Sequence, residues 1–104
     1  MTTPSFIAIL DFSTAAADRA AAIAQLEREQ PGIAAMPGCL AIRAFSSRQN
    51  DNDITVLHEW ADQPSFDAYL ASESFARSVA RLRPMMIGTP SSRRFLVELV
   101  ETVA

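Results

Sequence analysis

The stretch of residues 54–75 constrains the fold most strongly, because it reads as a strand that turns directly into a helix. Its first part is β-branched or apolar up to Trp60, which favours a strand. Asp62 and a proline two positions later supply a cap and a first-turn residue for a helix, and Phe66 and Tyr69 follow at helical spacing. The sequence therefore predicts that an aromatic strand end meets an aromatic helix face. This arrangement suits either a pocket wall or ordinary core packing.

Apolar periodicity and turn residues predict the strands and the first helix. Strands are expected at residues 6–12, 39–45, 53–60 and 95–103. The first helix follows a cap at Ser13 or Thr14, and it ends or kinks at Pro31. Its predicted inner face consists of Ala16, Ala20, Ile23 and Leu26. Charged side chains at residues 27–29 are expected to be solvated.

A second helix is predicted to begin near Gln63, break at residues 72–74 and end before Pro84, with a loop at residues 88–90. The order of elements is then β-α-β-β-α-β. This is the ferredoxin-like order, in which both helices cover one face of a four-stranded antiparallel sheet. With 104 residues, the chain is expected to form one α+β domain over residues 1–104.

Two helices can cover only one face of such a sheet, yet the first strand is apolar on both faces. Phe6, Ala8, Leu10 and Phe12 alternate with Ile7 and Ile9. The uncovered face would expose a large apolar patch, which monomers avoid. We therefore expect a homodimer in which two copies pack sheet face to sheet face about a two-fold axis.

Composition excludes several classes of function. The net charge is -3, and all nine basic residues are arginines without a long run, so neither nucleic acid nor an anionic membrane is an expected partner. A single cysteine, Cys39, and a single histidine, His58, leave no internal disulfide or His/Cys metal cluster. Three glycines and no phosphate loop argue against a nucleotide cofactor. We expect no bound cofactor or metal, and the lack of a leader or a long apolar run predicts a cytoplasmic protein.

Strand alternation places His58 and Trp60 on one face, where they would meet Phe66 and Tyr69 if that face is the helix-covered one. His58 could then act as an acid or base near neutral pH. The alternative is a hydrogen-bonded histidine of the core. Cys39 fits a small buried filler better than a nucleophile.

Other candidate residues have two interpretations each. Arg43 lies in an otherwise apolar strand and is either an edge charge or an anion-binding group inside a cavity. Met36 and the two methionines at residues 85–86 suit an adaptable apolar pocket, the core or an interface. Arg77 and Arg81 lie one helical turn apart, and we expect them on a solvated face.

Three segments together resemble one known family. They are the turn and strand MPGCLAIRAF at residues 36–45, the strand and helix HEWADQPSFDAYLASESF at residues 58–75, and the return into the last strand at residues 84–95. In order and spacing they are similar to the antibiotic biosynthesis monooxygenase-like family of dimeric α+β barrel proteins. The resemblance covers nearly the whole chain. It implies a ferredoxin-like fold, a homodimer built on the sheet faces, and a pocket between sheet and helices.

The resemblance also implies chemistry. Quinone-forming members oxidise aromatic polyketides with oxygen, without metal or flavin, and use a tryptophan at the end of the third strand, which Trp60 resembles. Their asparagine on the same strand face corresponds here to Val56, and their helix-two arginine has an offset counterpart in Arg81. Haem-degrading relatives use a histidine on helix two, which this chain lacks.

The leading hypothesis is a cofactor-independent monooxygenase that acts on an aromatic or apolar small molecule in a pocket between sheet and helices. The predicted catalytic residues are Trp60, His58 and Arg81, and the predicted substrate-binding residues are Phe66, Tyr69, Arg43 and Met36. One alternative is a non-catalytic ligand-binding or stress-associated dimer of the same fold, because fold does not fix function. Another is an isomerase or lyase with His58 as its base.

Overall fold

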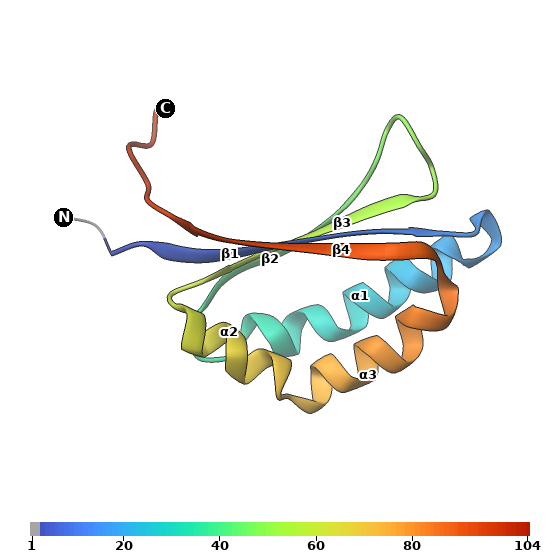
Figure 1. Ribbon diagram of the computed structural model, residues 1–104, viewed down its shortest axis with the longest axis horizontal. Helices are drawn as coiled ribbons and strands as arrows, with labels where there is room; N and C mark the ends of the chain where they lie inside the picture. The colour runs from blue at the N-terminus through green and yellow to red at the C-terminus, as the bar shows by residue number, and fades with distance from the viewer. Residues whose placement is uncertain (1–2) are drawn as a thin grey trace.

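The computed structural model describes residues 3–104 as one sheet with its helices on a single face (Figure 1). The four strands are antiparallel in the order β2-β3-β1-β4. The elements are β1 (Ser5–Thr14), η1 (Ala16–Asp18), α1 (Arg19–Ala34), β2 (Cys39–Ser46), β3 (Asp53–Trp60), α2 (Gln63–Leu70), α3 (Glu73–Leu82), η2 (Arg83–Met85) and β4 (Met86–Val97). The predicted ferredoxin-like α+β fold is confirmed, with the second helix divided into α2 and α3.

The register of the central strands decides which side chains face the helices. Antiparallel partners share a face, and β1 pairs with β3 from Phe6 opposite Trp60 to Phe12 opposite Ile54. Phe6, Ala8, Phe12, Ile54, Val56 and Trp60 are all buried against the helices. The core therefore lies between the sheet and the helical layer, on the face that the sequence assigned to His58 and Trp60.

The strand–helix unit of residues 54–75 forms as the sequence predicts. Asp62 caps α2 by accepting a hydrogen bond from the backbone N–H of Ser65 at 2.9 Å. Ser72 caps α3 in the same way, through the N–H of Phe75 at 3.2 Å. The second cap explains why the helix breaks, because Ser72 has extended backbone and starts a new helix.

The start of the first helix was predicted wrongly, and of the two outcomes expected at Pro31, an end or a kink, the helix does not take the first. Ser13 and Thr14 complete β1 instead of capping a helix, and the Thr14 side chain is fully buried. The turn η1 intervenes before α1 begins at Arg19. Pro31 does not end the helix, which continues to Ala34. Pro31 lacks a backbone N–H, so the helix loses only the hydrogen bond to the carbonyl of Glu27. Both residues are exposed, and water can therefore donate a hydrogen bond to that carbonyl instead.

The inner face of α1 also differs from the prediction. Ala16 and Ala20 are exposed, whereas Ile23 and Leu26 pack against the core as expected. The buried residues of the helix are Ala22, Gln25, Glu29 and Ile33. They follow one another at three- and four-residue spacing, so they form one continuous stripe that carries two polar side chains into the interior.

The last strand occupies β4, residues 86–97, and not residues 95–103. Residues 88–90, predicted as a loop, belong to this strand and bulge out of its pairing with β1 between Ser91 and Ile87. Gly88 supplies a positive φ there, and a proline fits because β4 is an edge strand. Residues 98–104 have no strand partner, and an apolar segment without a hydrogen-bonding partner does not form a β-strand.

The other edge strand, β2, carries an irregularity in its pairing with β3. Cys39 pairs with Trp60 and Ala41 with Glu59, so the register shifts at Leu40. Cys39 therefore packs against the core, and Leu40 is exposed. Regular alternation of side chains along this strand starts only after the bulge.

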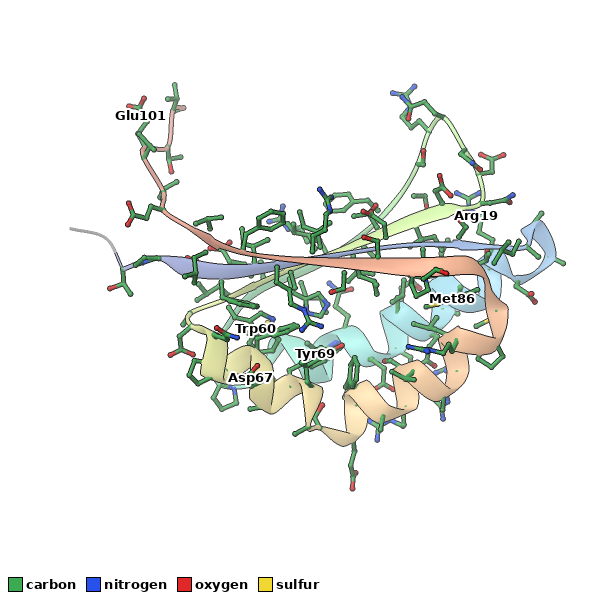
Figure 2. The ribbon with its side chains drawn as sticks, in the orientation of Figure 1. Arg19, Trp60, Asp67, Tyr69, Met86 and Glu101 are labelled. Atoms are coloured by element: carbon green, nitrogen blue, oxygen red, sulfur yellow. The ribbon has the colours of Figure 1, made fainter. Side chains whose placement is uncertain are left out.

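The uncovered sheet face carries both apolar and charged groups (Figure 2). Ile7 and Ile9 of β1 lie on it beside Leu57 of β3. Asp11 accepts a hydrogen bond from the Thr55 hydroxyl at 2.5 Å. Among residues 3–104, no helix has the length and apolarity needed to cross a membrane.

Candidate functional site

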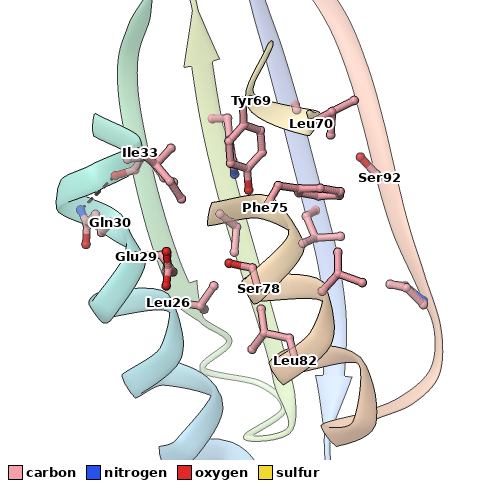
Figure 3. Close-up of a pocket in the computed structure, with 18 of the residues that line it drawn as sticks. Leu26, Glu29, Gln30, Ile33, Tyr69, Leu70, Phe75, Ser78, Leu82 and Ser92 are labelled. Carbon is pink, nitrogen blue, oxygen red and sulfur yellow. Dashed lines mark hydrogen bonds between the residues drawn. The ribbon is translucent and has the colours of Figure 1, made fainter. Parts of the chain in front are cut away.

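A cavity of about 300 Å³ lies between the sheet and the helices (Figure 3). Apolar side chains from the sheet, α1, α2 and α3 form most of its wall. Its polar lining residues are Glu29, Gln30, His58, Tyr69, Ser78, Arg83, Ser92 and Arg94. Its size and lining are those of a small-molecule site with a few placed polar groups.

The floor of the cavity is one cross-strand row of the sheet. His58 of β3 and Arg94 of β4 both pair with Ala8 of β1, so the three side chains point to the same face. Ile42 extends the row on β2. Ala8 carries only a methyl group, and it therefore leaves space between the imidazole and the guanidinium.

His58 is only 6% exposed and is surrounded by aromatic rings. Ring centroids lie at 5.1 Å for Tyr69, 6.2 Å for Trp60 and 6.4 Å for Phe66. Its Nδ1 has no hydrogen-bond partner within residues 3–104. Burial lowers the pKa of His58 to about 4, because the apolar surroundings disfavour the charged imidazolium. His58 is therefore neutral at pH 7 and can accept a proton or a hydrogen bond.

Trp60 lies behind the cavity wall. It is 0% exposed, and its ring stacks on Tyr69 at a centroid distance of 5.5 Å. Tyr69 lines the cavity, whereas Trp60 is not among the lining residues (Figure 3). Burial, with a smaller contribution from the Glu29 carboxylate, raises the pKa of Tyr69 to about 12. The Tyr69 hydroxyl therefore stays protonated and can donate a hydrogen bond.

Glu29 is the charged group that the sequence interpretation missed. It is buried on α1 and receives two hydrogen bonds from the Arg77 guanidinium, at 2.9 and 3.2 Å, and one from Ser74 at 2.8 Å. The Arg77 and Ser74 hydrogen bonds hold the pKa of Glu29 at about 2, against the opposing effect of burial. Arg81 adds a longer contact at 3.9 Å.

The prediction that Glu29 is solvated was therefore wrong, whereas Arg77 and Arg81 are exposed, as expected of a solvated helix face. The two arginines face α1, where they form ion pairs with the Glu29 carboxylate. The four-residue spacing from Gln25 through Glu29 to Ile33 was the available signal. It places the carboxylate on the same stripe as a core isoleucine.

The remaining predicted site residues lie apart from the cavity. Arg81 donates a hydrogen bond to Gln25 at 3.2 Å and does not line the cavity. Met36 packs against the aromatic core cluster. Arg43 is exposed on the edge strand β2 and borders a separate hollow beside α1, which is the edge-charge alternative. Burial raises the pKa of the Cys39 thiol, as expected for a filler.

Arg94 and Ser92 line the cavity but were not predicted. The sequence interpretation placed the last strand too late to include them. With β4 beginning at Met86, period-two alternation puts Pro90, Ser92 and Arg94 on the cavity side, and all three line it. The Arg94 guanidinium lies 5.0 Å from the ring centroid of Phe66, within the range of a cation–π contact.

Within residues 3–104, no three His, Cys, Asp or Glu side chains gather as a metal ion would need. The fold and the cavity define a ferredoxin-like α+β domain with an apolar pocket between its layers. Residues 5–81, which are most of the chain, match the family model described as "Antibiotic biosynthesis monooxygenase". The chain therefore belongs to the antibiotic biosynthesis monooxygenase family.

Solved structures share this fold across nearly their whole length. A candidate antibiotic biosynthesis monooxygenase from Nitrosomonas europaea has a TM-score of 0.87 at 8% identity, with 93% of both chains covered. A similar protein from Caulobacter crescentus also reaches 0.87, at 17% identity, with 93% of this chain and 92% of the other covered. Rv0793 from Mycobacterium tuberculosis reaches 0.84 at 15% identity and covers 95% and 99%. At these identities the likeness concerns the fold alone. No curated protein sequence matches the chain.

Proposed function

We propose that the protein is a monooxygenase that oxidises an aromatic or otherwise apolar small molecule with molecular oxygen, without a bound cofactor. The observation that carries this proposal is the neutral His58, buried beside an apolar cavity with a ring nitrogen that lacks a partner. Membership of the antibiotic biosynthesis monooxygenase family supports it. Phe66 and Tyr69 would form the walls against which an aromatic substrate stacks.

The proposed reaction begins when His58 accepts the proton of a phenol or enol. The resulting anion is electron-rich and passes an electron to oxygen, so the substrate itself supplies the reducing equivalents. Oxidation of a ring CH₂ group to a carbonyl balances: one oxygen atom enters the substrate, and the other leaves as water with both hydrogens. The protein contributes orientation and a site shielded from water.

The other predicted residues act indirectly in this scheme. Trp60 would hold Tyr69 in place through their stacked rings, so we propose it as a positioning residue. Arg81 would help to fix the stripe of α1 through Gln25 and Glu29. Both roles concern the shape of the cavity wall, not contact with the substrate.

We also propose that the protein is a cytoplasmic homodimer joined through the uncovered sheet face. Ile7, Ile9 and Leu57 give this face apolar area, and Phe95 of β4 is 40% exposed beside them. A second copy would remove these side chains from water. The assembly leaves the cavity on the helical side of each copy.

Oxygen uptake tests the proposed reaction. The purified protein would be mixed with hydroxylated two- and three-ring aromatics, and oxygen consumption and product mass would be recorded for the wild type and His58→Gln. We expect uptake by the wild type, one oxygen atom gained by the product, and a loss of about a hundredfold in rate in the variant, typical of removing a general base. Binding without uptake would instead favour the non-catalytic alternative. Proton exchange at a substrate carbon without uptake would favour an isomerase or lyase.

A further inference from the structure

We propose that Arg94 is the anion-binding residue of the cavity, and that the natural ligand is an aromatic molecule with an acidic oxygen group, bound as its anion between His58 and Arg94. This inference rests on the proposed function, because it names the substrate class for the same cavity. It adds the residue that stabilises the anion.

The register of the sheet places the two groups at a suitable separation. His58 and Arg94 lie on either side of Ala8, in one row across β3, β1 and β4. Neighbouring strands are about 4.8 Å apart, so the two backbones are separated by roughly 10 Å. The Ala8 methyl group is the only side chain between them on that row. The edge of a planar ring can therefore lie over Ala8, with an oxygen directed toward either polar group.

Arg83 also lines this cavity without an ion pair within residues 3–104, but Arg94 is the available charge in the row that holds His58. Within residues 3–104, Arg94 has no carboxylate within the 4.0 Å of an ion pair, whereas Arg77 and Arg81 already pair with Glu29. Its guanidinium is held over the Phe66 ring at 5.0 Å. A ligand that reaches the Phe66 side of the cavity would therefore meet a positioned cation.

The chemistry of His58 makes such a cation necessary. A buried histidine that is reluctant to take a proton is a weak base, and an ordinary phenol would keep its proton beside it. A nearby guanidinium favours the ionised form of the ligand and lowers the ligand's own pKa. The proton would move from the ligand hydroxyl to the imidazole, and the oxyanion would be stabilised by Arg94. Acidic phenols, enols and aromatic carboxylates share the group that this site recognises.

A matched pair of probes tests the proposal without requiring turnover. The anion 2-naphthoate and its neutral isostere 2-naphthamide would be titrated calorimetrically into the protein at pH 7. We expect the wild type to bind naphthoate about tenfold more tightly, as one charge-assisted hydrogen-bonded contact predicts. Arg94→Met should abolish this preference, so that naphthoate and naphthamide bind the variant about equally.

The control is Arg83→Met, because Arg83 lines the same cavity and its loss removes the same charge. It should retain the preference for naphthoate, and Arg94→Lys should retain most of it. Arg94 is exposed, so its variants should fold as the wild type does. If both probes bind the wild type equally, or if the preference survives in Arg94→Met, Arg94 is not the anion site and the proposed oxygenase stands. If neither probe binds, the aromatic-ligand proposal fails together with this one.

Discussion

Replacing His58 with glutamine should remove most of the dependence of stability on pH between 7 and 5. The folded protein holds His58 neutral with a pKa of about 4, below its ordinary value of 6.5, because the ring is buried among Trp60, Phe66 and Tyr69. The unfolded chain binds a proton near pH 6.5. It therefore takes up more protons than the folded state as the pH falls, and the free energy of unfolding decreases.

The magnitude follows from the two pKa values. The stability contribution of the neutral histidine is present above pH 6.5 and is lost as the pH falls through the interval from 6.5 to 4. At pH 5 the free energy of unfolding is lower than at pH 7 by about 2 kcal/mol. This follows because a difference of one pKa unit between the folded and unfolded states corresponds to about 1.4 kcal/mol. His58 is the only histidine of the chain, so no second imidazole shares this interval.

Urea unfolding at pH 7 and pH 5, at one protein concentration, measures the effect. The wild type should lose about 2 kcal/mol of unfolding free energy, and His58→Gln should lose much less, whatever its stability at pH 7. The NMR titration of the imidazole should give a pKa near 4 in the folded protein. A value near 6.5, or an equal loss in both proteins, would show that water reaches His58 and would refute the proposed neutral base.

Three further predictions concern the ion pair, the dimer and the aromatic wall. The low pKa of Glu29 contributes stability above pH 4.5 that disappears toward pH 2, so Glu29→Gln should flatten acid unfolding in that range. Val97→Asp, on the uncovered face, should convert the dimer expected in sedimentation experiments into a monomer. Leu96→Asp, on the opposite face, should leave the dimer intact. A wild type that sediments as a monomer would contradict this prediction. Trp60→Phe should lower stability by about 1–3 kcal/mol, measured by urea unfolding, and unchanged stability would argue against its fully buried position.

The family resemblance and the central elements were predictable because their signals are local. The cap at Asp62, the break at Ser72 and the alternation of β3 each depend on residues within one or two turns of chain. The face shared by His58 and Trp60 followed from period two alone. The ligand roles of these residues stay predictions.

The errors occurred where the partner of a segment decides its structure. Residues 98–104 look like a strand but have nothing to pair with, whereas residues 88–90 look like a loop and lie within β4 because β1 accommodates the bulge there. Arg94 was missed for this reason, since its face depends on where β4 begins.

The sequence by itself determined the order of elements, the cap of α2 at Asp62 and the pairing of aromatic residues at the junction of β3 and α2. The tertiary structure alone decided that Glu29 pairs with Arg77, that His58 is neutral, and that Arg94 lies across Ala8 from it. Caps and periodicity are set by neighbours along the chain. Burial, ion pairing and pKa values depend on segments that come into contact only when the helices pack on the sheet. No local sequence pattern specifies the distances between the side chains of those segments.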